Sequence, residues 1–575
     1  MPHPIGRNWQ KTSWNRCFAS GVFRRYSPSW YVYRVFLPDR PVNSPRAKKL
    51  LLAATLVAPI VIGGFVVQER TAQSGVRLFQ QVVAIVNDRF VDSLSVGALY
   101  EKAARGLVTE LKDPYAELYT PKDLDMFNQN TGGFYGGVGM TIVSQEGLIT
   151  VEKVFPRTPA ERAGIRVGDK IVGVDTANVR GWRIEQVSAK LKGPPGTPVN
   201  ARFLRPGSEP FAVTFTREVV RIPAVPYAIM LDHKVAYIPV QGFSETASSE
   251  VRASLTRLVA EGAKGVVLDL RGNPGGFLEQ ADTMTNIFLE KGQEIVSVRQ
   301  RGDPTITHVT TQKALAPAIP VIILTDGRSA SASEIVAGAL QDHDRALVLG
   351  TTSFGKGLVQ SMYRLDGGYA IKLTTAKWYT PSGRSIQRER KITDDGQLIE
   401  VHPDSLESDS VRAARPKFKS DGGRTVYGGG AITPDIIVPF DTLTSVEQRF
   451  DRMLAVKSQE AYLALYDYAF ELRGKVKPDF VITPEMRDEF FQRLGKRGVS
   501  VERKDFDAAQ AYVNRMLDNR ISTLAFGDST AKRRFVKEDP QLRKAVELLQ
   551  RGSTTRDLLA LAPSATPATT KPEPR

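Results

Sequence analysis

The chain has 575 residues and a formal net charge of +16, and Cys17 is its one cysteine. A single cysteine excludes an intramolecular disulfide and argues against a structural zinc site. The charge is concentrated in residues 1–49, which contain ten Lys or Arg and one acid. We therefore expect no nucleic-acid partner, because such proteins gather basic residues on a folded module.

Residues 50–67 follow this basic segment as an apolar stretch of 18 residues without a charge. That length is the lower end for a membrane-spanning helix. Arg46, Lys48 and Lys49 precede it and predict a cytoplasmic N-terminus by the positive-inside rule. A cleaved secretory signal is the alternative, although no clear cleavage site follows the stretch. We expect an uncleaved, single-pass transmembrane helix, with the rest of the chain on the periplasmic, extracytoplasmic side of the cell membrane.

The remainder of the chain changes character several times. Apolar residues at intervals of three and four predict helices in residues 70–130. Frequent glycine and short β-like runs predict a small β-rich domain in residues 132–218. Residues 224–440 alternate strand-like and helix-like patterns, which predicts an α/β fold with a mixed, largely parallel sheet. Helical spacing returns in residues 441–561, and residues 562–575 are rich in Pro, Thr and Ala and are predicted to be disordered.

The α/β part contains a group of small and polar residues between two predicted strands. The apolar runs 321–324 and 347–349 have the length and β-branched content of buried strands. Three alternating serines lie between these runs: Ser329, Ser331 and Ser333. A turn of small residues between a strand and a helix can present a hydroxyl at a helix N-terminus, where free N–H groups point outward. Lys356 lies between two glycines just past the second run, which makes it a candidate partner for such a hydroxyl.

Two structural alternatives apply to these residues. Ser331 and Glu334 also fit the S-x-x-E capping box, in which the serine only caps the helix. Residues 350–356 also match the phosphate-binding pattern G-x-x-x-x-G-K. The next residue is Gly357, however, so the metal-binding hydroxyl of a P-loop is missing, and the following residues read as a strand instead of a helix.

The stretch from Ser329 to Gln360 resembles the active-site signature of the C-terminal processing (tail-specific) serine peptidases. Two further blocks, residues 268–276 and 374–386, resemble the glycine-rich oxyanion loop and a downstream strand and turn of that family. The resemblance covers about residues 75–440. It implies these catalytic residues and roles: Ser331 as nucleophile, Lys356 as general base and Gln360 as the residue that orients the lysine.

The chemistry of a serine–lysine pair explains why these residue types are needed. A serine hydroxyl must lose its proton as it attacks, and lysine accepts that proton only when it is neutral. The unperturbed pKa of lysine is about 10.4, and burial lowers it. If the segment is a strand, Lys356 and Gln360 face the same side. The attacked carbonyl becomes an oxyanion and needs N–H donors, which the resemblance assigns to Ala332 and to Gly275 or Gly276.

Residues 132–218 resemble a PDZ domain through the motifs G-G-V-G-M and P-A-E-R-A-G-I-R-V-G-D-K-I. In a PDZ domain a peptide pairs as an extra strand, and backbone N–H groups bind its terminal carboxylate. The resemblance implies the following members of this peptide-binding loop: Gly137, Val138, Gly139 and Met140. A glycine-rich hairpin domain without a ligand is the alternative. Lys192 stands where many relatives have an arginine that links the PDZ position to activity, and lysine lacks the bidentate geometry of arginine.

By resemblance the fold is α/β, with a crotonase-like (ClpP/crotonase) peptidase core, an inserted β-rich PDZ domain and flanking helical segments. The implied function is a membrane-anchored serine endopeptidase that recognises the flexible C-terminal tails of protein substrates without a metal or cofactor. The oligomeric state is left open, with a homo-oligomer among the options. The alternatives are a catalytically silent PDZ adaptor on a peptidase fold and a crotonase-type acyl-transfer enzyme.

Overall fold

The structure is a computed structural model that describes residues 74–145, 148–205, 208–388, 390–392, 398–400, 414–440 and 443–562. Three predicted segments lie outside the described residues: the basic segment, the anchor at 50–67 and all but the first residue of the tail at 562–575. No helix in the described ranges combines the length and the apolar composition of a membrane crossing. Residues up to Tyr100 and those from Glu101 onward form two units, which are described separately.

The first unit, where the structure describes it, is helical. Residues 74–89 form a helix, and α2 (Val96–Glu110) begins in this unit. Several apolar side chains of these helices are exposed, for example Val76 at 58% and Leu78 at 63%. The apolar spacing at intervals of three and four therefore correctly predicts helices in this unit, although several of the apolar side chains are not buried.

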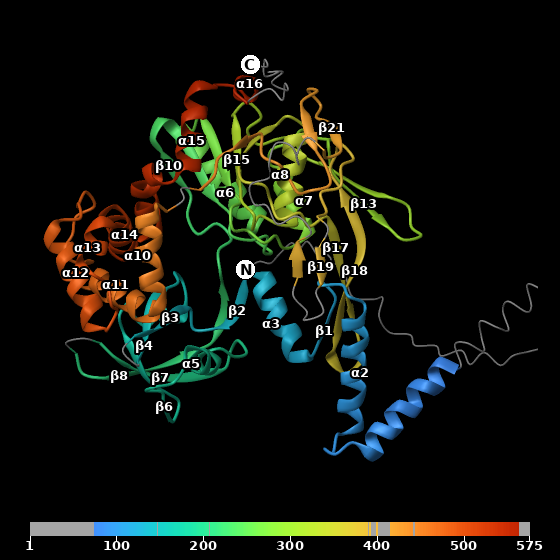
Figure 1. Ribbon diagram of the computed structural model, residues 1–575, viewed down its shortest axis with the longest axis horizontal. Helices are drawn as coiled ribbons and strands as arrows, with labels where there is room; N and C mark the ends of the chain where they lie inside the picture. The colour runs from blue at the N-terminus through green and yellow to red at the C-terminus, as the bar shows by residue number, and fades with distance from the viewer. Residues whose placement is uncertain are drawn as a thin grey trace, which may run out of the picture. The chain divides into compact units, whose positions relative to one another are not determined.

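The centre of the second unit is a six-stranded sheet in the order β10-β11-β12-β15-β16-β23 (Figure 1). β10 is antiparallel to β11, and the other neighbouring strands are parallel. This arrangement confirms the mixed α/β prediction. The strands are β10 (Ile229–Leu231), β11 (Val235–Pro239), β12 (Gly265–Asp269), β15 (Val321–Thr325), β16 (Ala346–Gly350) and β23 (Ile436–Ile437).

The two faces of this sheet pack against different helices because side chains alternate along each strand. Ala236 and Ile238 of β11 belong to an apolar cluster with α6 (Ala247–Ala260), α7 (Leu278–Thr285) and α8 (Ala332–Asp342). Tyr237 and Val267 belong to a second cluster with α15 (Pro540–Arg551) and α16 (Thr555–Ala560). C-terminal helices therefore complete the core of a sheet that begins more than 300 residues earlier in the chain.

A second, antiparallel sheet lies beside α8 and positions the segment that contains Lys356. Its order is β1-β18-β13-β14, with β17 also paired to β18. Trp378 of β18 is fully buried, and its Nε1–H donates to the Lys356 carbonyl at 3.0 Å. The strands are β1 (Glu117–Tyr119), β13 (Glu294–Gln300), β14 (Ile306–Val309), β17 (Leu358–Arg364) and β18 (Ala370–Tyr379).

The glycine-rich stretch forms a β-rich domain inserted after α3 (Pro121–Gly132). The chain enters through β2 (Phe134–Gly137) and leaves through β9 (Glu218–Arg221), and these two strands pair antiparallel. Inside the domain the strand order is β3-β4-β5-β7-β8, with β6 on β5. The elements are β3 (Met140–Gln145), β4 (Leu148–Val154), α4 (Pro159–Arg162), β5 (Lys170–Val174), β6 (Ala177–Asn178), α5 (Ile184–Leu191), β7 (Pro198–Leu204) and β8 (Phe211–Thr216).

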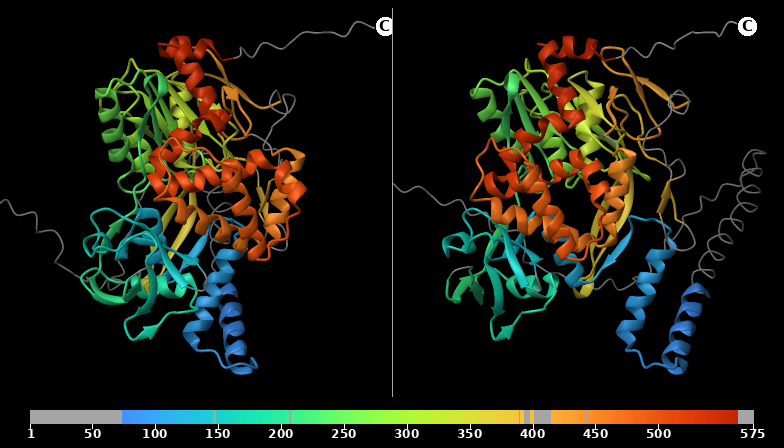
Figure 2. Two further views of the ribbon diagram at one scale, coloured as in Figure 1. Left: turned by 90° about the vertical axis from the view of Figure 1, so that its left-hand side faces the viewer. Right: turned by 60° about the vertical axis from the view of Figure 1, so that its left-hand side comes forward.

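The helices α10 to α14 form a bundle around buried aromatic residues such as Phe450 and Phe506 (Figure 2). The bundle also contacts the inserted domain, because Lys153 of β4 pairs with Asp528 of α14 at 2.8 Å. The helices are α10 (Ser445–Val456), α11 (Ser458–Leu472), α12 (Pro484–Lys496), α13 (Arg503–Ala508) and α14 (Gln510–Phe535). Two pairs of short antiparallel strands precede this bundle in the chain: β19 (Arg390–Ile392) with β20 (Leu398–Glu400), and β21 (Lys417–Lys419) with β22 (Thr425–Tyr427).

Candidate active site

Ser331 occupies the turn between β15 and α8, at the N-cap of the helix, with φ 55° and ψ −113°. A positive φ is strained for a residue with a side chain, and such strain collects at functional sites. The neighbouring serines are buried and bonded to the scaffold: Ser329 Oγ donates to Leu270 O at 2.8 Å, and Ser333 Oγ donates to Asn273 O at 3.0 Å. Ser331 is partly exposed, so it is the serine of the three whose hydroxyl is accessible to a substrate.

The buried carboxylate of Glu334 connects this turn to the lysine segment. Its Oε2 accepts the backbone N–H of Ser331 at 2.8 Å and that of Lys356 at 2.9 Å. Its Oε1 accepts the Ser353 hydroxyl and the Gly355 N–H, both at 2.6 Å. Burial raises the pKa of Glu334, and these four hydrogen bonds oppose the shift. The capping contact expected from the sequence is thus present through the glutamate, and the same side chain also joins the two catalytic candidates.

Lys356 lies in a setting that favours its neutral form. Its pKa is lowered from 10.5 to about 8, chiefly by burial and then by the charge of Lys372, while Glu334 and Asp113 oppose the shift. The Lys356 amine lies 4.8 Å from the centre of the Tyr115 ring, which covers it on one side. A lysine with such a pKa can act as a base near neutral pH.

The Gln360 side chain hydrogen-bonds to Thr374, whereas the predicted partner was the amine of Lys356. Its Nε2 donates to the Thr374 hydroxyl at 3.4 Å. The expected same-side alternation with Lys356 does not apply, because β17 begins only at Leu358 and a register shift separates Val359 from Gln360. The role of Gln360 in orienting the lysine remains a prediction.

The loop of residues 271–276, here called the oxyanion loop, packs directly against the serine turn. A Cβ on Gly275 would lie 2.9 Å from the Cβ of Ser331 and 3.0 Å from the Ala332 nitrogen, so this contact needs glycine. The Gly275 N–H donates to Asn273 Oδ1 at 2.9 Å and is therefore committed to the loop itself. In the described part of the chain, the N–H groups of Gly276 and Ala332 have no acceptor. These two are the better oxyanion candidates of the three predicted donors.

The predicted peptide-binding loop, Gly137 to Met140, joins β2 to β3 in the inserted domain. Gly139 has φ 90°, and a Cβ there would lie 2.2 Å from the Thr158 Cβ. The Val138 carbonyl accepts the Ala160 N–H at 2.8 Å, which fixes the loop against α4. This geometry explains why the loop requires glycine at position 139.

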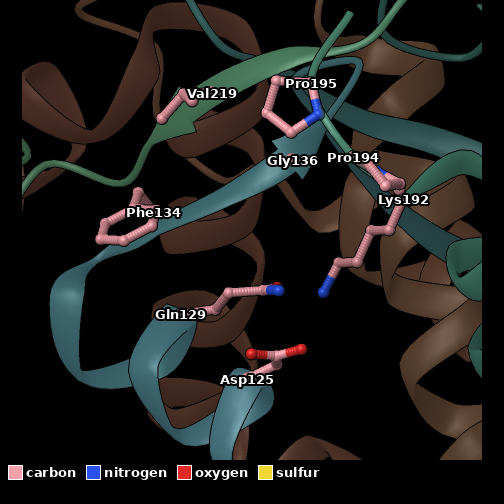
Figure 3. Close-up of a pocket in the computed structure, with 9 residues that line it drawn as sticks. Asp125, Gln129, Phe134, Gly136, Lys192, Pro194, Pro195 and Val219 are labelled. Carbon is pink, nitrogen blue, oxygen red and sulfur yellow. The ribbon is translucent and has the colours of Figure 1, made fainter. Parts of the chain in front are cut away.

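A pocket of about 420 Å³ lies where the inserted domain joins α3. The Lys192 amine and the Asp125 carboxylate face each other across it, with Gln129 beside them (Figure 3). The Lys192 amine also lies 5.0 Å from the centre of the Tyr135 ring. Burial raises the pKa of the Tyr135 hydroxyl to about 12, and a backbone hydrogen bond with Met140 opposes this. The Lys192 side chain is therefore placed at the junction and close to the predicted peptide-binding loop.

The candidate site thus combines a partly exposed serine on a strained turn, a lysine of lowered pKa and N–H groups that have no acceptor among the described residues. These are groups that a serine-type peptidase requires. The sequence model of peptidase family S41 matches residues 234–398 of the chain, and the sequence model of the PDZ domain matches residues 150–205.

Three relatives support the same assignment. A carboxy-terminal-processing protease of Bartonella bacilliformis is 37% identical over 315 residues, or 54% of this chain and 72% of that protein. The carboxy-terminal processing protease CtpA of Bacillus subtilis is 33% identical, over 51% of this chain and 62% of that protein. A probable CtpA-like serine protease of Staphylococcus aureus is 35% identical, over 55% and 64%. The chain belongs to peptidase family S41, with the carboxy-terminal processing serine proteases.

Among solved structures, a photosystem II D1 C-terminal processing protease aligns at 28% identity and a TM-score of 0.31, covering 54% of this chain and 89% of that one. The PDZ domain of a carboxy-terminal protease from Vibrio cholerae, solved with a peptide, aligns at 26% identity and a TM-score of 0.15, covering 16% and 99%.

Sequence reasoning missed two residues of this site. Glu334 was expected only as a helix cap, and its bonds to the lysine segment depend on a contact between residues 22 positions apart. Tyr115 lies two residues before β1 and was not among the predicted site residues. No pattern in the sequence indicates that its ring lies against Lys356, because the two residues are far apart in the chain.

Proposed function

We propose that the chain is an exported, membrane-anchored serine endopeptidase in which Ser331 attacks the peptide bond and Lys356 is the base. The observation that supports this most directly is the shared Glu334 oxygen. The two backbone nitrogens bonded to it lie less than about 6 Å apart, given ordinary hydrogen-bond lengths. The Ser331 and Lys356 side chains therefore start from neighbouring backbone positions.

The proposed reaction uses the lysine twice as a proton carrier. Neutral Lys356 takes the Ser331 proton as the oxygen attacks the substrate carbonyl, and the N–H groups of Gly276 and Ala332 stabilise the resulting oxyanion. The lysine then protonates the leaving amine, and the C-terminal fragment departs. Lys356 next removes a proton from water, and the water oxygen attacks the acyl-serine ester. As the ester bond breaks, the lysine returns that proton to the Ser331 oxygen, and the remaining product leaves as a carboxylic acid. Gln360 is proposed to orient the lysine amine in the reactive state.

The inserted PDZ domain is proposed to select the substrates. A tail would add as a strand beside β3, with its carboxylate at the backbone of the loop from Gly137 to Met140. The family match to a PDZ domain and the tight packing at Gly139 support this. The substrates would be proteins whose flexible C-termini end in apolar residues.

The cellular setting is also part of the proposal. Residues 50–67 would span the membrane once and leave the catalytic part on the periplasmic side, and their composition is the support for this. The core would be of the crotonase-like type, as the alternation of strands and helices around a largely parallel sheet suggests. Fractionating cells that express the chain with and without residues 50–67 tests the anchor directly.

The central test is Ser331→Ala in the full chain, with an unstructured protein ending in an apolar tail as substrate. We expect cleavage to fall about 1,000-fold or more, while binding of the tail peptide is unchanged. Ser249→Ala, an exposed serine on α6, is the matched control and should cleave like the parent. Equal cleavage by Ser331→Ala and the parent would refute the nucleophile assignment. Tail binding without any cleavage by the parent between pH 7 and 9 would instead identify a silent adaptor.

A further inference from the structure

The guanidinium of Arg271, the first residue of the oxyanion loop, is saturated by hydrogen bonds. Its Nε donates to Asp269 Oδ1 at 2.9 Å, and its Nη2 donates to Asp269 Oδ2 at 2.6 Å and to Asp539 Oδ2 at 2.9 Å. Its Nη1 donates to Asp539 Oδ1 at 3.0 Å and to Gln541 Oε1 at 2.9 Å. All five N–H groups of an arginine are thus used. Asp539 supplies both of its oxygens and lies 268 residues further along the chain.

The cluster around Arg271 is buried and balanced in charge. The Arg271 and Asp539 side chains are 12% and 10% exposed. Lys532 donates to Asp539 Oδ2 at 2.8 Å, and the Tyr237 hydroxyl donates to Asp269 Oδ2 at 2.7 Å. Burial alone would raise the pKa of Asp539, but Arg271 and then Lys532 lower it below its ordinary range. Two cations and two anions therefore compensate each other, and removing one charge leaves a buried imbalance.

Arg271 is followed at once by the residues that face the nucleophile. The Gly272 N–H donates to Asp326 Oδ1 at 2.9 Å, and the Asn273 carbonyl accepts the Ala330 N–H at 3.0 Å. These bonds attach the middle of the loop to the serine turn. Arg271 attaches its beginning to α15, which packs on the opposite face of the central sheet from α8. The loop is therefore fixed from both faces of the sheet.

We infer that Asp539 is a positioning residue for the oxyanion loop: by its paired hydrogen bonds it fixes Arg271, and through Arg271 the direction of the Gly276 N–H. The inference rests on the proposed function, since it assigns that N–H to the oxyanion. It gives the C-terminal helices a role in the reaction, although they lie beyond residues 234–398, which the peptidase family matches. Asp539 itself does not touch the substrate.

The test variant is Asp539→Asn in the full chain. Asn is as good an N-cap as Asp, so the cap on α15, in which Asp539 Oδ1 accepts the Leu542 N–H at 3.0 Å, is retained. Arg271 keeps Asp269 as a partner, but Arg271 and Lys532 lose the carboxylate that they share, so the cluster carries one excess positive charge. Because loss of an entire oxyanion donor costs about 100- to 1,000-fold in kcat, we expect misdirection of one donor to lower kcat about tenfold, with KM within twofold of the parent.

A peptide boronic acid with an apolar side chain gives a second readout. It forms a tetrahedral adduct with a serine hydroxyl and so resembles the transition state, whereas KM reports the bound substrate. We expect Asp539→Asn to weaken boronate inhibition about tenfold, in parallel with kcat. A purely structural role would lower the folded fraction, measured by circular dichroism, and would leave kcat per folded molecule and the boronate inhibition constant unchanged.

The matched control is Asp518→Asn in α14. Asp518 forms the same kind of paired bonds with Arg534, both at 2.8 Å, but not with the oxyanion loop. It should keep the parent's kcat and boronate inhibition. If Asp539→Asn does not fold, Gln541→Met removes one bond to Arg271 and should show a smaller decrease in the same two quantities.

The outcomes separate this inference from the proposed function. Parent-like kcat and boronate inhibition in folded Asp539→Asn, or in folded Gln541→Met where the first does not fold, would overturn the inference alone. A parent enzyme that neither cleaves a tailed substrate nor binds the boronate would overturn the proposed function. A decrease of equal size in Asp518→Asn would show a general effect of the helical bundle and would also overturn the inference.

Discussion

Ser331 and Lys356 donate their backbone N–H groups to the same carboxylate oxygen, Oε2 of Glu334, at 2.8 and 2.9 Å. One buried side chain therefore sets the spacing between the turn that presents the hydroxyl and the segment that presents the amine. Because Glu334 is on α8, the helix that follows the serine, movement of either segment disturbs both.

Glu334→Gln is predicted to lower kcat about 10- to 100-fold, because an amide cannot accept four N–H or O–H donors as a carboxylate does. The loss of about one to two buried hydrogen bonds should also lower the free energy of unfolding by about 1–3 kcal/mol. Steady-state kinetics and thermal unfolding measure the two effects. Glu447→Gln is the control, because Glu447 also closes a capping box, accepting the Thr444 N–H at 2.8 Å, but on α10. A similar loss of kcat in this control would contradict the role of Glu334 in holding Ser331 and Lys356 at a fixed spacing.

The rate is predicted to rise with pH through about 8, the lowered pKa of Lys356. Below that pH the lysine is mostly protonated, so kcat/KM should increase about tenfold per pH unit and then level. The folded state binds fewer protons than the unfolded state between about pH 8 and 10.5. This lysine therefore makes stability increase with pH in that window, and its burial penalty is fully present below it. A pH profile of kcat/KM without a rise between pH 6 and 8 would argue against Lys356 as the base.

Tyr115→Ala is predicted to move this profile toward higher pH. The ring lies 4.8 Å from the Lys356 amine, and its removal admits water, which weakens the burial that chiefly lowers the lysine pKa. Tyr115→Phe keeps the ring and should retain the parent's profile. The position of the acidic limb of kcat/KM measures the difference. Equal shifts in both variants would implicate the hydroxyl instead of the ring.

Gly275→Ala is predicted to abolish most of the activity, by about 100-fold or more in kcat. Its φ is 97°, and the new Cβ would lie 2.7 Å from the Ala330 carbonyl, so the oxyanion loop and the serine turn must separate. Gly262→Ala has a similar φ of 89° but meets no atom within 4 Å. It should cost about 1 kcal/mol of stability without a change in kcat.

Gly139→Ala is predicted to impair tail binding rather than the chemistry. The added Cβ would lie 2.2 Å from the Thr158 Cβ and displace the loop from Gly137 to Met140. We expect the Kd of a labelled apolar tail peptide, measured by fluorescence anisotropy, to rise about tenfold or more. Gly196→Ala, with φ 84° and no atom within 4 Å, should bind like the parent. An unchanged Kd in Gly139→Ala would show that the tail peptide does not bind at the loop from Gly137 to Met140.

The central sheet could be predicted because its strands are short, buried and rich in β-branched residues, as in β15. The docking of α15 could not, since helical spacing shows that a face is apolar but not which surface it covers. The pairing of Asp539 with Arg271 joins residues 268 positions apart, and no local pattern reports it.

At the candidate site, the motifs single out the serine and the lysine as candidates, but they do not report what surrounds these residues. The sequence does not show that Gly275 uses its N–H on Asn273, which leaves Gly276 as the free donor. It also does not show the register shift at Gln360, because such a shift depends on the partner strand β18.

The inserted domain enters and leaves the host through adjacent positions, since Phe134 pairs with Arg221 and the Ile222 N–H donates to the Gly133 carbonyl at 2.7 Å. For the peptidase core, the whole domain is equivalent to one long loop whose two ends are in contact, and lengthening such a loop costs little closure entropy. The inserted domain can thus be exchanged at little cost in closure entropy, provided that its contacts with the helical bundle, such as Lys153 with Asp528, are replaced.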